Sequence, residues 1–220
     1  MNLIESNDRH LLNDSSMEIW SIDLRSYAPE ECFLTSFLDQ DEIKKANRFK
    51  FKHLKKNYIL SHGILRKLLS SYLLISPEDI SFSYGPFGKP YLSNKAIHFN
   101  MSHSQDRAIY VFSLKKTVGI DIEYIKPTLS IEDLPLAVLS KQEQEKIAEL
   151  PLHEQKIAFY KKWTQKEAYL KAIGTGLQNN LAEISIPTTP DWNYFEIPLP
   201  LDYVGAVAAT SILQTDHNTA

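Results

Sequence analysis

The residues of this sequence whose spacing could do chemistry begin with two carboxylates in an apolar segment. Asp121 and Glu123 lie two residues apart within residues 118–124, where apolar side chains occupy every second position. Because successive side chains of a β-strand point to opposite faces, both carboxylates would lie on the face away from the apolar side chains. Mg²⁺ takes oxygen ligands, usually one or two carboxylates completed by water and substrate phosphates. The pair indicates half of a magnesium site, although taken alone it also fits a solvent-exposed sheet face.

A third acidic residue stands four positions before a lysine in a stretch with a helical pattern. Residues 155–172 contain no Pro or Gly, and Gly174 follows where a left-handed C-cap belongs. Trp163, Glu167 and Lys171 recur every fourth residue, so they share one helix face. Glu167 could supply a third carboxylate, and Lys171 could neutralise a phosphate oxygen. The alternative is a surface helix that carries an ordinary i,i+4 ion pair.

The sequence also places a histidine between two serines. His103 lies between Ser102 and Ser104, and a lone histidine is more often structural or exposed than functional. A serine hydrolase is disfavoured because no Gly-x-Ser-x-Gly motif is present, and neither a Gly-rich phosphate loop nor metal-ligand spacing of the histidines occurs. The residues alone predict a magnesium-dependent enzyme acting on a phosphate ester or anhydride, with five candidate side chains: His103, Asp121, Glu123, Glu167 and Lys171.

Composition is that of an ordinary globular protein. The 220 residues are 43% hydrophobic and 23% charged. The single cysteine, Cys32, excludes an intramolecular disulfide framework and fits a reducing compartment. Residues 1–16 are polar, without the apolar core of a signal peptide, and no run is long enough to cross a bilayer. These features predict a cytoplasmic protein with no membrane partner.

Positive charge is concentrated in one region of an acidic chain. The formal net charge is −3, which argues against a general nucleic-acid binder. Residues 41–67 contain nine Lys and Arg against two Asp and Glu, so this stretch carries +7 and the remainder −10. Such a basic region suggests an anionic partner or ligand. The alternative is a solvated helix face with long cationic side chains.

Local patterns predict both helices and strands along the chain, and the fold class is α+β. A helix is expected over residues 29–38, Asp39 or Asp41 could cap the basic helix that follows, and residues 58–74 repeat apolar side chains at helical spacing. Residues 184–186 are expected to form a closing strand.

The chain is expected to consist of two α+β halves. The predicted boundaries are a flexible leader at 1–16, halves at 17–115 and 116–213, and a polar tail at 214–220. A faint similarity between residues 20–24 and 118–122 hints at internal duplication, although five residues are weak evidence for a repeat.

Four motifs together resemble a known family. They are Phe87-Gly88-Lys89-Pro90, Phe99-Asn100-Met101-Ser102-His103-Ser104, Val118-Gly119-Ile120-Asp121-Ile122-Glu123, and the stretch from Trp163 to Leu177 with its Lys-Glu-Ala-Tyr-Leu-Lys-Ala core. In this order and at these separations they resemble the 4′-phosphopantetheinyl transferases of the surfactin-synthetase-activating (Sfp) type. The resemblance covers about residues 18 to 213.

The resemblance implies a fold and a reaction. Two similar α+β halves would be related by a pseudo-twofold axis, with coenzyme A bound in the cleft between them. The enzyme would move 4′-phosphopantetheine from coenzyme A onto a serine of an apo acyl or peptidyl carrier protein, releasing 3′,5′-ADP in a Mg²⁺-dependent reaction. The carrier would present an acidic surface, and the enzyme would be a monomer.

The resemblance also implies roles for individual residues. Asp121, Glu123 and Glu167 would hold Mg²⁺ on the pyrophosphate of coenzyme A. Glu167, or a water it shares, would deprotonate the attacking serine, and Lys171 would stabilise charge on the leaving group. Contacts with coenzyme A are implied for a further set of residues: Lys56, Lys89, Asn100, Ser102, His103 and Lys171. Among these, His103 would contact the phosphates and Lys89 would lie near the nucleotide end.

One position departs from the family pattern. Many relatives carry an arginine for the 3′-phosphate near the place where this sequence has Lys55-Lys56-Asn57, so Lys56 takes that role by position and charge only. The basic stretch from Lys44 could bind either coenzyme A or an acidic carrier protein. Two other functions remain open from the residues alone: a magnesium-dependent phosphodiesterase or nuclease, and a non-enzymatic module that docks an anionic partner.

Overall fold

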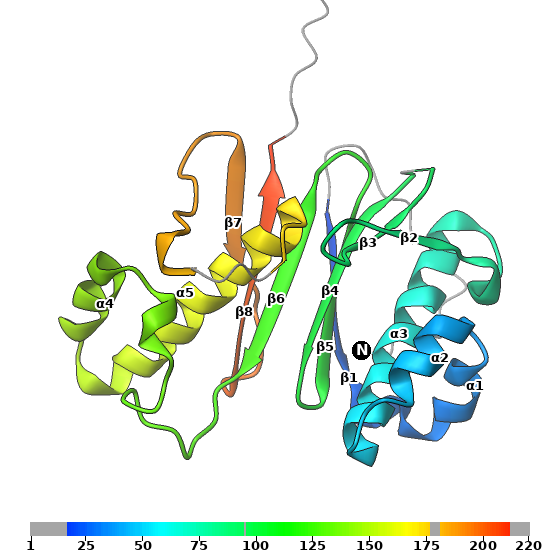
Figure 1. Cartoon of the computed structure of the whole chain (residues 1–220), viewed down its shortest axis with the longest axis horizontal. Helices are drawn as coiled ribbons and strands as arrows, with labels where there is room; N and C mark the ends of the chain where they lie inside the picture. Colours follow the sequence, from blue (N-terminus) through cyan, green and yellow to red (C-terminus); the bar gives the residue numbers. More distant parts are fainter. Residues whose placement is uncertain (1–16, 95, 177–180, 212–220) are drawn as a thin grey trace, which may run out of the picture.

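The structure, a computed structural model, describes residues 17–94, 96–176 and 181–211. The predicted leader at 1–16 and tail at 214–220 lie outside the described residues. Helices and antiparallel strands are mixed along the described chain, which confirms the α+β class (Figure 1). No helix among the described residues is long and apolar enough to cross a membrane.

The first sheet is built only from strands before residue 115. Its antiparallel order is β1-β5-β4, formed by β1 (Glu18–Asp23), β4 (His98–Ser104) and β5 (Arg107–Ser113). Between β1 and β4 the chain forms the 3-10 helix η1 (Leu24–Glu30), α1 (Glu31–Thr35), α2 (Gln40–Ala46), α3 (Lys52–Leu73), the 3-10 helix η2 (Pro77–Asp79) and a hairpin of β2 (Phe82–Tyr84) and β3 (Pro90–Leu92).

The second sheet is built only from strands after residue 116. Its antiparallel order is β6-β8-β7, formed by β6 (Val118–Tyr124), β7 (Trp192–Glu196) and β8 (Tyr203–Thr210). Between β6 and β7 the chain forms the 3-10 helix η3 (Leu136–Val138), α4 (Lys141–Ala148), α5 (Leu152–Ile173) and the 3-10 helix η4 (Leu181–Glu183). The strand expected at 184–186 is wrong, because these residues join no sheet.

The two sheets share one plan. In each, a first strand is followed by a helix of 22 residues, and the last of the three strands pairs between the other two. An internal duplication would produce this repeated order of elements. The halves at 17–115 and 116–213 and their pseudo-twofold relation stay predictions.

Helix ends follow the expected local signals. Asp39 caps α2, accepting from the backbone N–H groups of Asp41 and Glu42, which confirms it as the cap. Gly174 ends α5 in the left-handed conformation at φ 74°, confirming the C-cap. The helix expected over 29–38 is shorter, because a 3-10 helix precedes Glu31 and α1 ends at Thr35.

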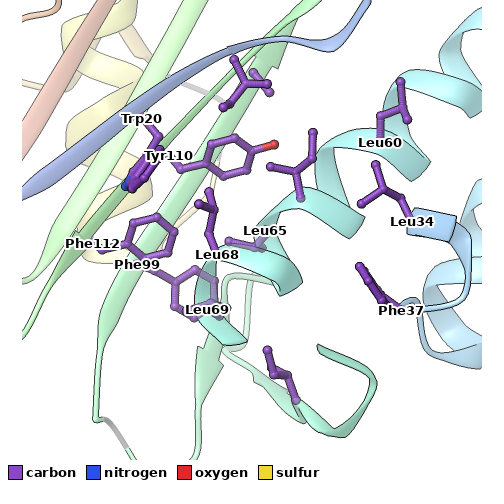
Figure 2. Packing of buried hydrophobic residues seen from close by; sticks show 14 of the residues in the cluster. Trp20, Leu34, Phe37, Leu60, Leu65, Leu68, Leu69, Phe99, Tyr110 and Phe112 are labelled. Atoms are coloured by element: carbon purple, nitrogen blue, oxygen red, sulfur yellow. The ribbon is translucent and has the colours of Figure 1, made fainter. Parts of the chain in front are cut away.

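The core of the first half lies between α3 and its sheet (Figure 2). Leu65, Leu68 and Leu69 of α3 are buried against Trp20, Phe99, Tyr110 and Phe112 from the three strands. Burying one leucine side chain contributes about 1.5–3 kcal/mol, so this packing holds α3 firmly over the sheet.

Close packing fixes α5 on β6. A Cβ on Gly119 would lie 2.1 Å from the carbonyl oxygen of Ala168, so only glycine lets the helix approach this closely. On the opposite face of β6, Ile120 packs with Ile109 and Val111 of β5, which joins the two sheets through one apolar cluster. The face of β6 that carries Asp121 and Glu123 is therefore covered by α5.

Candidate active site

The edges of the two sheets meet through side chains. The backbone N–H of Ile120 donates to Oδ1 of Asn100 at 3.0 Å, and that of Tyr124 donates to Oγ of Ser104 at 3.1 Å. Side chains of β4 thereby accept hydrogen bonds from backbone N–H groups of β6, because no strand ladder joins these two strands. The structure places Asn100 at this junction, so its predicted contact with coenzyme A stays a prediction.

An ion pair between buried Asp121 and half-buried Lys171 lies in the middle of the junction. The Nζ of Lys171 donates to Oδ1 of Asp121 at 2.6 Å and to Oγ of Ser102 at 2.9 Å. Ser102 in turn donates to the same Oδ1 at 2.9 Å. The predicted residues of β4, β6 and α5 are thus brought into one hydrogen-bonded group, although they lie up to 69 positions apart.

Glu123 lies one pleat further along β6, beside the same helix face. Its Oε2 accepts from Oγ of Ser104 at 3.1 Å, and its Oε1 accepts from Nε1 of Trp163 at 3.3 Å. Burial, followed by the charge of Asp121, raises the pKa of Glu123 above its ordinary value. The hydrogen bond from the Trp163 indole to Glu123 accounts for an aromatic residue on the same helix face as Glu167 and Lys171.

Glu167 is the least compensated carboxylate of the group. It is buried, and its Oε1 has no hydrogen-bond partner among the described residues; the same holds for Oδ2 of Asp121. Burial and then the charge of Asp121 raise the pKa of Glu167 to about 7, against the opposing effect of Lys171. Three carboxylates compete here for one ammonium group, which leaves an excess of negative charge.

The carboxylate oxygens of this group suit a divalent cation as ligands. No three His, Cys, Asp or Glu side chains within the described ranges stand close enough together to form a metal site as they are arranged. Two buried carboxylate oxygens nonetheless lack partners, and buried polar groups ordinarily have them. A hard cation takes such oxygens as ligands. The chemistry of Asp121, Glu123 and Glu167 thus suits Mg²⁺, while Lys171 neutralises Asp121 in this arrangement.

His103 lies on the other face of β4 from Ser102, toward the first half. Loss of hydration, and then the charges of His62, Lys171 and Lys45, lower the pKa of His103 below its ordinary value. His103 keeps an exposed surface, so its loss of hydration is partial. The ring is a neutral hydrogen-bonding group at neutral pH.

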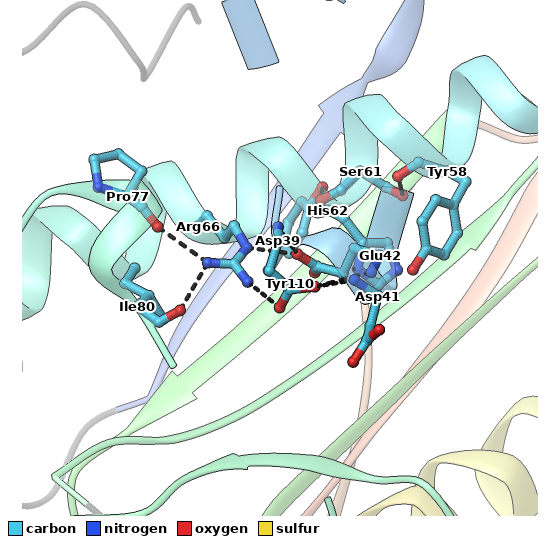
Figure 3. Close-up of polar contacts among 10 residues, drawn as sticks. All are labelled: Asp39, Asp41, Glu42, Tyr58, Ser61, His62, Arg66, Pro77, Ile80 and Tyr110. Carbon is cyan, nitrogen blue, oxygen red and sulfur yellow. Dashed lines mark hydrogen bonds and ion pairs between the residues drawn. The ribbon is translucent and has the colours of Figure 1, made fainter. Parts of the chain in front are cut away.

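A cavity of about 210 Å³ lies near His103, between α2, α3 and the β2–β3 hairpin. Its lining includes Lys45, Tyr58, His62 and Tyr84. The ring of His62 stacks on Tyr58 with centroids 4.0 Å apart, and its Nδ1 lies 3.1 Å from Oε1 of Glu42 (Figure 3). Sequence motifs did not identify this lining; the only signal was the basic composition around Lys45.

A larger cavity of about 490 Å³ contains none of the residues of the carboxylate–lysine group. It is lined by Arg107, Tyr124, Tyr203 and neighbouring loop residues of both signs of charge. The side chain of Arg107 donates to Ser21 and lies over the ring of Tyr203. Size alone therefore does not mark the site, whereas the uncompensated carboxylates do.

Two lysines predicted to bind coenzyme A have other partners here. The Nζ of Lys89 donates to the carbonyl oxygens of Ala172 at 2.7 Å and Val118 at 3.1 Å, and burial lowers its pKa to about 8. Lys89 thus links the β2–β3 hairpin to the end of α5. Lys56 lies 4.0 Å from Oε2 of Glu31 on α1. The structure does not bring either lysine to the carboxylate group, and their predicted roles stay predictions.

Sequence reasoning missed a buried lysine next to Glu167. The Nζ of Lys166 lies 2.7 Å from Oε2 of Glu143 and 3.1 Å from the carbonyl oxygen of Leu181. Glu143 also closes the capping box of α4 with Ser140. The signal in the sequence was that Lys166 directly precedes Glu167 on a helix. Consecutive side chains of a helix face different surroundings, so Lys166 had to have partners other than those of Glu167. Lys166 holds α4 against α5 while Glu167 faces β6.

The fold and the site together define an α+β protein with a carboxylate–lysine centre buried where two three-stranded sheets meet. The carboxyl-terminal part, residues 117–218, matches the model of the 4′-phosphopantetheinyl transferase superfamily. Residues 26–113 match the model of the 4′-phosphopantetheinyl transferase N-terminal region.

Individual relatives agree with the family models. The 4′-phosphopantetheinyl transferase HetI of Nostoc sp. strain PCC 7120 is 34% identical over 212 residues, which cover 90% of this chain and 89% of HetI. The 4′-phosphopantetheinyl transferase Sfp of Bacillus subtilis strain 168 is 32% identical over 152 residues, 69% of this chain and 66% of Sfp. The 4′-phosphopantetheinyl transferase gsp of Aneurinibacillus migulanus is 34% identical over 149 residues, 66% of this chain and 60% of that protein. The chain belongs to the 4′-phosphopantetheinyl transferase superfamily, which does not favour the nuclease or docking-module alternatives.

Proposed function

We propose that this protein transfers 4′-phosphopantetheine from coenzyme A to a serine hydroxyl of an apo acyl or peptidyl carrier protein, releasing 3′,5′-ADP. The serine oxygen forms a bond to the β-phosphorus, the bond from that phosphorus to the bridging oxygen of the pyrophosphate breaks, and the serine proton passes to a base. The supporting observation is the buried group of Asp121, Glu167 and Lys171, which leaves carboxylate oxygens unpartnered in a member of this superfamily.

The reaction would depend on Mg²⁺ held by Asp121, Glu123 and Glu167. When bound, the ion would neutralise charge on the pyrophosphate and on the leaving group. Support comes from the burial of these carboxylates and then from the charge of Asp121, which together raise the pKa of both Glu123 and Glu167.

Two side chains of α5 carry the remaining chemistry. Lys171 would stabilise negative charge on the departing 3′,5′-ADP, since its ammonium already lies between Ser102 and Asp121. Glu167 would take the serine proton, directly or through a water. A pKa of about 7 suits a group that must accept a proton at neutral pH.

Coenzyme A would extend from this centre into the cavity of the first half. His103 is within electrostatic reach of Lys171 at this centre and of His62 and Lys45 at the cavity, and its neutral ring can donate to a phosphate oxygen. Lys45 lines the cavity and acts on the pKa of His103, whereas Lys56 pairs with Glu31. Lys45 is therefore a second candidate for binding the 3′-phosphate, beside Lys56.

The two predicted halves, 17–115 and 116–213, would be related by a pseudo-twofold axis with the substrates between them. The identical strand order of the two sheets supports this relation. The protein would act as a monomer on a carrier with an acidic surface.

The test is the intact mass of an apo acyl carrier protein after incubation with this protein, coenzyme A and Mg²⁺. A gain of one phosphopantetheine that disappears with EDTA is expected. No gain across several acyl and peptidyl carriers would reject the proposed reaction.

A further inference from the structure

The turn into α3 presents cations and large apolar side chains together on the surface. Arg48, Lys50, Phe51, Lys52 and Leu54 are all exposed. Phe51 keeps 62% of its surface in solvent and Leu54 keeps 40%. A single exposed apolar residue needs no explanation, but two beside three cations form a patch of the kind that binds other proteins. We call these five residues the Arg48–Leu54 surface.

Folding stability does not account for this composition. The first turn of α3 has no acidic residue, and its N-cap residue Phe51 makes no side-chain capping bond, whereas α2 and α4 both carry capping boxes. Cations near a helix N-terminus are unfavourable, by about 0.3–1 kcal/mol each at the surface. Within the described ranges, Arg48, Lys50 and Lys52 have no ion-pair partner. The positive charge is left available to a partner.

The Arg48–Leu54 surface borders the site. Leu54 and Tyr58 are four residues apart on α3, so they share a helix face, and Tyr58 lines the cavity near His103. One turn from Leu54, Nδ2 of Asn57 donates to the carbonyl oxygen of Gln105 at 2.8 Å. Gln105 directly follows Ser104, whose hydroxyl donates to Glu123. A protein seated on this surface would therefore lie next to the carboxylate group.

We propose that the Arg48–Leu54 surface docks the carrier protein, through an acidic face that surrounds an apolar side chain. The proposal rests on the proposed function and adds where the protein substrate binds. Phe51 would be the anchor because exposed aromatic residues dominate binding energy once they are covered. Arg48, Lys50 and Lys52 would steer the acidic partner and fix its orientation.

Two other occupants fit the surface less well. Coenzyme A phosphates already have His103, Lys45 and Lys171 near the site, and they offer nothing to cover two apolar side chains. A nucleic acid would meet an acidic protein of net charge −3 whose positive charge forms no extended track. The combination of apolar and cationic groups favours an acidic protein.

The experiment measures transfer kinetics with two variants, Phe51→Ala and the double variant Lys50→Glu/Lys52→Glu. Each should raise KM for the carrier at least about fivefold, as expected for an interface anchor or a reversed charge pair. KM for coenzyme A should stay unchanged. Thermal unfolding should be unaffected in Phe51→Ala because the side chain is exposed. The double variant should be no less stable than the wild type, because it replaces cations near the N-terminus of α3 with acidic side chains. Matched controls on the other half are Phe195→Ala on β7 and Lys146→Glu on α4, which should leave both KM values unchanged.

A direct binding measurement separates this proposal from the proposed function. Fluorescently labelled apo carrier protein should bind the wild type and lose affinity for both variants, whether or not transfer occurs. Failure of transfer with this binding pattern would reject only the proposed reaction. The docking proposal is overturned if both variants bind the carrier as the wild type does, or if KM for coenzyme A rises as much as KM for the carrier. Loss of binding to duplex DNA or anionic vesicles, with carrier binding intact, would also overturn it.

Discussion

Two charge groups, one on α2 and α3 and the other on α5 and β6, differ in how completely they are paired. In the first group the guanidinium of Arg66 is fully buried and donates to Glu42 at 2.7 Å and Asp39 at 2.8 Å. It also donates to the carbonyl oxygens of Ile80 at 2.7 Å and Pro77 at 3.1 Å (Figure 3). Both carboxylates have further donors, so the group is satisfied from within the fold.

The second group, on α5 and β6, is not satisfied in this way. Lys171 alone compensates Asp121, while one oxygen of Asp121 and one of Glu167 have no partner among the described residues. The pKa values report the same contrast. Burial raises the pKa of Glu42, but its bond with His62 and the charge of Arg66 more than offset this and lower it below the ordinary value. The pKa of Glu167 is raised to about 7.

The difference separates a group that holds the fold from a group that binds. A buried charge without compensation costs free energy, and such groups cluster at sites where a ligand or a reaction uses them. The pairing of Arg66 fastens α2 and the segment after α3 to the helix. The excess charge around Glu167 is available to a cation and to a proton. Substitutions in the two groups should therefore affect different properties.

The largest expected effect is on transfer by Glu167→Gln. This change keeps the shape of the side chain and removes both the base and a carboxylate ligand, so activity should fall at least about 100-fold. The folded state should be retained, because the wild-type carboxylate is itself uncompensated. The measurement is carrier mass gain over time, with unfolding followed in parallel. Glu154→Gln, an acidic residue in the first turn of α5, is the matched control; full transfer by the Glu167 variant would remove it from the mechanism.

Arg66→Met should mainly affect stability. Removing one partner of a buried ion pair leaves uncompensated carboxylates, which costs about 3–5 kcal/mol. Urea unfolding should show this loss, while the residual folded protein should keep most of its transfer activity. Arg25→Met is the control, because its pair with Asp23 lies at the surface, where solvent screens ion pairs and leaves them little effect on stability. Equal losses in the two variants would contradict the structural role of Arg66.

Much of the catalytic group follows from local sequence patterns. Helical spacing predicts that Glu167 and Lys171 share one face of a helix, and strand alternation predicts that Asp121 and Glu123 share one face of a strand. The structure forms both elements, α5 and β6, as expected. The contact of Lys171 with Asp121 depends on how α5 lies on β6. That packing requires Gly119 and the small residues Ala168 and Ala172 of α5. The chemistry of the side chains grouped the two elements in one site, but no local pattern predicts this contact.

Other positions show why a local pattern is insufficient. Asn100 lies in a motif, yet its oxygen accepts from the backbone of β6, because a missing strand partner there must be replaced by a side chain. The strand expected at 184–186 does not form, since Pro187 and Pro190 follow and cannot donate to a ladder. Tertiary needs determine both outcomes, and no short window of sequence contains them.

A smaller effect should appear in the pH dependence of stability. Because the folded pKa of Glu167 is about 7 against an ordinary 4.5, the native state binds more protons than the unfolded state between these values. Stability from this group is therefore lost as pH rises through that window, by about 3 kcal/mol. Glu167→Gln should stabilise the metal-free protein more at pH 8 than at pH 5. Mg²⁺ should raise the melting temperature of the wild type more at pH 8, and an equal rise at both pH values would contradict this assignment.

The smallest effect is expected at Lys89, which belongs to neither group. Its ammonium donates to two carbonyl oxygens, one at the start of β6 and one at the end of α5. Burial of the charge lowers the pKa of Lys89 to about 8. Lys89→Met loses the hydrogen bonds and also removes the buried charge, so the net loss of stability should be about 1 kcal/mol or less. A slight shift of the end of α5 should lower kcat a few-fold through Lys171, with KM for coenzyme A unchanged. A rise in KM for coenzyme A, with kcat intact, would show instead that Lys89 binds the nucleotide.

The Gly88→Ala variant is the control for a change in the same hairpin. A Cβ at this position meets no atom within 4 Å, so its only cost is backbone strain at φ 82°. If Lys89→Met shows the rise in KM and Gly88→Ala does not, a lysine that stabilises the fold also binds the ligand.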